Sequence, residues 1–66
     1  MDTPEHQTDR HEARIRRIAG EAVRAAKGFD GWRAYEAAKG YVRREYGPHI
    51  DEYDAILNAI TDRLGL

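Results

Sequence analysis

Residues 50–65, which run IDEYDAILNAITDRLG, decide the fold of this chain. The large apolar residues after Asp51 in this stretch are Tyr53, Ile56, Leu57, Ile60 and Leu64. Their spacing of three and four residues places them on one face of an α-helix. Asp51 precedes that face as an N-cap, and Gly65 follows it as a stop signal. The stretch therefore predicts a helix over residues 52–64 with one side buried.

Two segments upstream have the same punctuation. The helix stop signals of the chain are Gly28, Gly47-Pro48 and Gly65. Pro4 suits the first position of one helix, and Asp30 suits the N-cap of the next. We therefore expect helices over residues 4–27 and 31–46. Thr8 offers a second start for the first helix, so fraying is expected over residues 1–8.

No segment alternates apolar and polar residues with period two, so no strand is expected. Links of about three to four residues make consecutive helices antiparallel neighbours. The sequence thus predicts an all-α fold, a small antiparallel three-helix bundle that forms a single domain over residues 1–66. The expected core is Ile18, Ala22, Tyr35, Val42, Tyr53, Ile56, Leu57, Ile60 and Leu64.

The apolar content is low for a folded domain. Leu, Ile, Val and Phe together number eleven of 66 residues. A core of this size supplies roughly 3–5 kcal/mol at most. We therefore expect the chain to gain stability from a bound protein partner or from weak homodimer formation.

Charge is sorted along the chain. Residues 10–44 contain ten basic and four acidic residues, a net charge of +6, whereas the whole chain has a net charge of -1. Part of this sorting stabilises helix ends, because acids at residues 51–54 suit a helix start and Arg43 and Arg44 suit a helix end. The basic residues of the first helix need another explanation.

Four arginines form a ridge on the first helix. The ridge consists of Arg10, Arg14, Arg17 and Arg24. At about 100° per residue they fall within roughly 80° of one another, opposite the apolar stripe. The ridge is either a solvated face or a docking strip for phosphates or acidic partner residues, which suit the planar guanidinium group.

Aromatic residues must supply much of so lean a core. Trp32 and Tyr41 lie off the centre of their helical stripe, so we expect them to be partly exposed and available to a partner. A stacking platform for single-stranded nucleic acid is the alternative role for the rings. Gly20 and Gly40 fall on the polar faces of their helices, where they are either tolerated or allow close approach by another chain.

Nothing in the sequence indicates catalysis. Serine and cysteine are absent, and His6, His11 and His49 are not spaced to converge on a metal ion. Asp51, Glu52 and Asp54 lack the glycine of a calcium loop. We therefore expect no enzyme activity, no metal and no cofactor.

The N-terminus is polar and acidic, and no apolar run approaches the roughly 20 residues of a membrane span, so a cytoplasmic location without membrane contact is expected. The leading hypothesis is a small non-enzymatic protein-interaction module, a regulator, inhibitor or accessory subunit that docks on a larger protein. The candidate contact residues are Arg10, Arg14, Arg17, Arg24, Trp32 and Tyr41. The alternative is a nucleic-acid-associated protein that binds phosphates non-specifically through the arginine ridge.

Overall fold

The computed structural model describes the backbone of residues 4–66 and the side chains of residues 10–66. It contains three α-helices: α1 (Pro4–Ala25), α2 (Gly31–Tyr46) and α3 (Tyr53–Leu64). No strand occurs in residues 4–66. Each helix contacts the other two. The all-α three-helix bundle expected from the sequence is confirmed.

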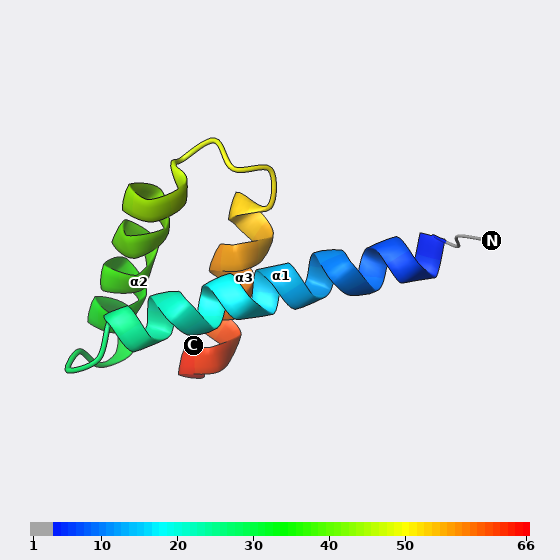
Figure 1. Cartoon of the computed structure of the whole chain (residues 1–66). Helices are drawn as coiled ribbons and strands as arrows, with labels where there is room; N and C mark the ends of the chain where they lie inside the picture. The colour runs from blue at the N-terminus through cyan, green and yellow to red at the C-terminus, as the bar shows by residue number, and fades with distance from the viewer. Residues whose placement is uncertain (1–3) are drawn as a thin grey trace.

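Two of the helices form an antiparallel pair and the third lies across them. α2 and α3 lie side by side and run in opposite directions, and α1 crosses both of them, with its N-terminal part extending beyond the pair (Figure 1). The molecule measures 45 × 23 × 15 Å. Its radius of gyration of 12.6 Å exceeds the value of about 11 Å for a compact domain of this length. The long α1 helix explains the difference, because its 22 residues span about 33 Å.

The links between helices are residues 26–30 and 47–52, longer than the sequence suggested. The N-cap position of α3 is Glu52, so the assignment of Asp51 to this position is wrong. The reason is a turn before the helix: the Tyr53 N–H donates to the Ile50 carbonyl at 3.0 Å. Asp30 does occupy the N-cap position of α2, although its side chain makes no capping hydrogen bond.

Glycines end α2 and α3. Gly65 adopts a left-handed conformation with φ of 73°, which a residue with a side chain rarely takes. Its N–H donates to the Asp62 carbonyl, and the N–H of Leu66 donates to the Thr61 carbonyl at 2.9 Å. These two bonds satisfy carbonyl groups that the last helical turn leaves without partners.

Small side chains dominate the core. The buried apolar residues are Ile18, Ala19, Ala22, Ala26, Ala34, Ala38, Val42, Ile56 and Ile60. Five of these nine are alanines, so the helices approach closely and bury little apolar area per residue. Partly buried side chains, among them Ile15, Leu57 and Leu64, pack against this cluster.

The expected core is right for its five smaller or β-branched members and wrong for four larger ones. Tyr35, Tyr53, Leu57 and Leu64 are only partly buried. With only three helices, α1 crossing the α2–α3 pair (Figure 1), the bundle encloses a small core, so a long side chain at its edge keeps one side in water. The alanines complete the buried set in their place.

The position of Gly20 also differs from expectation. It was placed on the polar face of the first helix, but it is buried. The Arg63 side chain of α3 covers it, with Nη2 3.3 Å from where a Cβ atom would stand. Because α1 contacts two helices, its buried surface is wider than a single apolar stripe.

Replacement of a fully buried isoleucine tests the core. Ile60 is 0% exposed, and Ile60→Ala should destabilise the chain by roughly 2–5 kcal/mol through lost burial and a residual cavity. Urea unfolding followed by circular dichroism measures the loss. The exposed Asn58→Ala on the same helix is the control and should change stability by less than about 0.5 kcal/mol. Equal effects of the two substitutions would contradict the core.

Candidate functional site

The arginine ridge does not act as one surface. Arg14 Nη2 lies 3.9 Å from Glu52 Oε1, and His11 Nδ1 lies 3.5 Å from the other oxygen of the same carboxylate. Glu52 is only 10% exposed at its side chain. The start of α3 therefore supplies an acidic partner to α1, and the acidic end of the sequence partly neutralises its basic middle. Arg10 is exposed and also has an interaction of its own.

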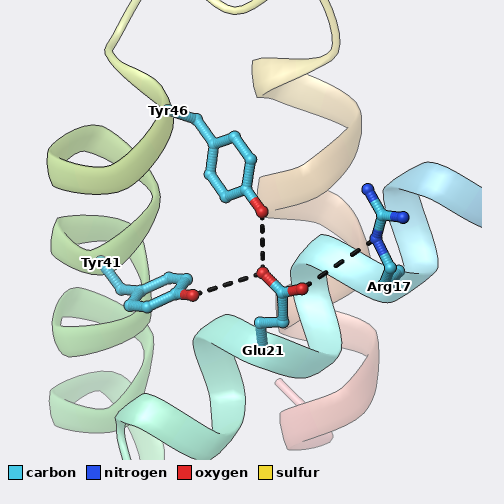
Figure 2. A network of polar contacts seen from close by, with 4 residues as sticks. All are labelled: Arg17, Glu21, Tyr41 and Tyr46. Carbon is cyan, nitrogen blue, oxygen red and sulfur yellow. Dashed lines mark hydrogen bonds and ion pairs between the residues drawn. The ribbon is translucent and has the colours of Figure 1, made fainter.

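Glu21 is the centre of a polar network between α1 and α2 (Figure 2). Its Oε1 atom accepts hydrogen bonds from the hydroxyls of Tyr46 at 2.8 Å and Tyr41 at 3.3 Å. Its Oε2 atom lies 4.0 Å from Arg17 Nε. The Glu21 side chain is 28% exposed. Two hydroxyl donors and one cation stabilise this mostly buried carboxylate. Its bonds to Tyr41 and Tyr46 fix the position of α2 on α1.

The network changes the acidity of both tyrosines. Burial, and then the charge and hydrogen bond of Glu21, raise the pKa of the Tyr41 hydroxyl above its ordinary value of 10.0. The hydrogen bond to Glu21, and then burial, raise the pKa of Tyr46. Removing a proton from either phenol would place two negative charges side by side. Both tyrosines therefore stay neutral and act as hydrogen-bond donors within the fold.

The last member of the ridge, Arg24, lies apart from Arg10 and Arg14. Its Nη1 atom is 3.7 Å from the Cβ position of Gly20, close to the guanidinium group of Arg63. The structure thus brings Arg24 together with a residue of α3 that sequence analysis did not select. No acidic side chain in residues 10–66 forms an ion pair with Arg24 or Arg63.

The aromatic edge consists of Phe29, Trp32 and Tyr35, at the α1–α2 link and the start of α2. Trp32 is 63% exposed and Phe29 is 55% exposed. The exposure expected for Trp32 is confirmed. The Trp32 ring meets the Tyr35 ring edge to face, with centroids 5.4 Å apart and planes at 80°. Lys39 Nζ lies 5.4 Å from the centre of the Tyr35 ring. The tryptophan is therefore both accessible and supported from one side.

No family model, curated protein or solved structure matches this chain. Its function must be inferred from its own residues. Among the side chains of residues 10–66, no group of three or more His, Cys, Asp or Glu could hold a metal ion; His6 lies outside that range. Along residues 4–66, no helix combines the length and the apolar character that crossing a membrane requires.

Of the six candidate contact residues, Trp32 is exposed, whereas Tyr41 is half buried and hydrogen-bonded to Glu21. Sequence analysis missed Arg63, the role of Gly20 and the pairing of Glu21 with two tyrosines. One signal could have found Arg63. Like Arg24, it is a base in the last turn of its helix, although this signal does not show that the two side chains meet.

The tyrosine network predicts a dependence of stability on alkaline pH. Because the folded chain favours the neutral phenols, the stability they contribute is complete below about pH 10 and is lost as pH rises through the raised pKa values of Tyr41 and Tyr46. Glu21→Gln keeps an acceptor oxygen but removes the charge. Absorbance titration at alkaline pH should show these tyrosines ionising at lower pH in the variant.

The matched control for this titration is Glu12→Gln. Glu12 is an exposed acid of α1 whose partner is Arg16, so it lies outside the network. Its replacement should leave the tyrosine titration unchanged. A titration curve that is the same in wild type and Glu21→Gln would mean that the hydrogen bonds to Glu21 are not formed in solution.

Proposed function

We propose that this chain is a small, non-enzymatic protein-interaction module of the cytoplasm, which acts as a regulator, inhibitor or accessory subunit of a larger protein. Its docking surface is the aromatic edge of Phe29, Trp32 and Tyr35. One observation carries the proposal. The single tryptophan of the chain is 63% exposed in a protein whose core is short of large apolar residues.

Energetics support a contact role for Trp32. Burying a tryptophan at a binding surface contributes far more than burying an average residue, and tryptophan and arginine are enriched among residues that dominate binding energy. Trp32 is supported by Tyr35, and Tyr35 lies beneath Lys39. A side chain already restrained loses less conformational entropy on binding. Trp32 is therefore suited to serve as an anchor.

Basic side chains accompany the aromatic edge. Lys27 and Arg33 are exposed on either side of Phe29 and Trp32 in the sequence, and Asp30 is the acid among them. Charges at the rim of an interface mainly steer the approach of a partner and select against like-charged ones. A partner surface with an apolar pocket and acidic surroundings fits this arrangement.

The nucleic-acid alternative has less support than it had from the sequence. Two members of the ridge, Arg14 and Arg17, already face Glu52 and Glu21. A phosphate bound to either arginine would compete with that carboxylate. The ion pairs of Arg14 and Arg17 therefore disfavour salt-dependent binding through four independent phosphate contacts. The experiment below separates the two classes of partner.

A capture experiment tests the docking surface. The immobilised chain should retain protein partners from a lysate of the source organism after nuclease treatment. The double variant Phe29→Ala/Trp32→Ala should lose them, because it removes the aromatic anchors, while circular dichroism stays unchanged. His49→Ala, an exposed residue of the α2–α3 link, is the control and should retain them. Partners that disappear with nuclease would favour the nucleic-acid role instead.

The same surface can also mediate weak homodimer formation. Trp32 and Tyr41 were candidate contacts together with Gly20 and Gly40, but Gly20 is covered by Arg63 of its own chain. Contact between copies is therefore expected at Trp32. Sedimentation at tens of micromolar should show a species above 7.6 kDa, with Trp32 fluorescence moving to shorter wavelength as protein concentration rises. A monomer with constant emission would leave the hetero-partner as the occupant of the edge.

A further inference from the structure

Two arginines from different helices converge on one glycine. Arg24 belongs to the last turn of α1, and Arg63 belongs to the last turn of α3. Arg63 Nη2 lies 3.3 Å and Arg24 Nη1 lies 3.7 Å from the Cβ position of Gly20, so the two nitrogens are no more than about 7 Å apart. Both arginines are exposed, whereas Gly20 is buried.

No carboxylate of the part of the chain whose side chains are described neutralises the two guanidinium groups. Neither forms an ion pair with a carboxylate among the side chains of residues 10–66. By contrast, Arg14, Arg16 and Arg17 of α1 each face a glutamate. Two like charges at this separation repel each other. An anion between them would replace that repulsion with two attractions.

Helix dipoles explain only part of the arrangement. A base in the last turn of a helix is favourable, which accounts for Arg24 and Arg63 one at a time. The dipole does not require that two such side chains turn toward the same point. The absence of a side chain at Gly20 creates the space, because a Cβ there would stand at an unusually short distance from Arg63.

We propose that Arg24 and Arg63, whose guanidinium groups lie against Gly20, form a binding site for an oxyanion, a phosphate monoester or a carboxylate, carried by the protein partner. Charge-assisted hydrogen bonds from a guanidinium nitrogen to such an oxygen are about 2.8 Å long. One oxyanion placed between the two nitrogens can reach both. The planar fork of arginine suits phosphate and carboxylate groups, which a lysine pair would hold with less directional specificity.

The position of the site connects it with the aromatic edge. α1 ends, α2 begins and α3 ends on the same side of the bundle (Figure 1). The residues that remain exposed and large on this side are Phe29, Trp32 and Leu66. A partner segment that buries Trp32 and also places an acidic or phosphorylated side chain between Arg24 and Arg63 would use both features. The assignment of the oxyanion to a protein partner rests on the proposed function, whereas the oxyanion site itself does not.

Nuclear magnetic resonance of the arginine side chains tests the site without a known partner. Inorganic phosphate and, separately, acetate are titrated at constant ionic strength, and the Nε–Hε signals are followed. The signals of Arg24 and Arg63 should move together and saturate. The signal of Arg44, which is 68% exposed and faces Glu45, should not saturate with them. Uniform, non-saturating shifts of all arginines would overturn the site. Comparing phosphate with acetate identifies the preferred oxyanion.

Three substitutions examine the geometry. Arg63→Gln should weaken phosphate binding about tenfold or more, because a charge-assisted bond is lost. Arg63→Lys keeps the charge but loses the fork and should also weaken it. Gly20→Ala should displace the Arg63 guanidinium and reduce affinity while preserving the helix. Arg44→Gln is the control for net charge. Equal affinity in Gly20→Ala and wild type would contradict the role of the glycine.

The test separates failure of the site from failure of the proposed function. Trp32→Ala should retain phosphate binding, because Trp32 is not part of the oxyanion site. A captured protein partner should be lost with either Trp32→Ala or Arg63→Gln, and peptides of that partner with phosphoserine or with aspartate would identify the bound group. Retention of the partner by Arg63→Gln would overturn the assignment to the partner. Tighter binding of a single-stranded oligonucleotide than of phosphate, lost in Arg63→Gln, would overturn it in favour of nucleic acid.

Discussion

Close packing of alanines on α1 is the constraint on which the rest of the structure depends. Ala19 and Ala22 of α1, and Ala26 directly after it, are buried together with Ala34 and Ala38 of α2. Such small side chains permit close approach of the helix backbones, but each contributes little apolar area. Among the side chains of residues 10–66, only four larger ones are fully enclosed. The helices therefore depend on polar contacts at the edges of the core to fix their relative positions.

Two carboxylates provide those contacts, and both connect α1 to another helix. Glu21 of α1 accepts the hydroxyls of Tyr41 and Tyr46 from α2, and Glu52 at the start of α3 faces Arg14 and His11 of α1. The cations of these pairs are about half or more exposed, so the ion pairs themselves contribute little to stability. Their geometry still specifies which surfaces of α1 the other two helices occupy. Part of the charge pattern of the sequence is thus a pattern of contacts between helices, and the rest consists of pairs within one helix, such as Glu12 with Arg16 and Glu36 with Lys39.

The sequence allowed the helices to be predicted well because helical periodicity and terminal glycines are local signals. The core and the site depended on information that a single helix does not contain. Tyr35 and Leu57 were expected inside because they lie on apolar stripes, but the bundle is too thin to enclose them. Gly20 lies on a polar face by periodicity and is buried by Arg63. Which charges meet depends on how α3 crosses α1, and spacing along one helix does not determine a crossing.

The thinness of the molecule also affects how it unfolds. The shortest extent of the molecule is 15 Å, so every residue lies within one helix layer of solvent. Unfolding enthalpy scales with length at about 0.7 kcal/mol per residue, so a chain of 66 residues melts over a wide temperature range. A ligand at a hundred times its Kd adds about 2.7 kcal/mol by mass action, which is comparable to what so small a core supplies. The concentration of a binding partner would therefore set the folded fraction of this chain as well as its occupancy.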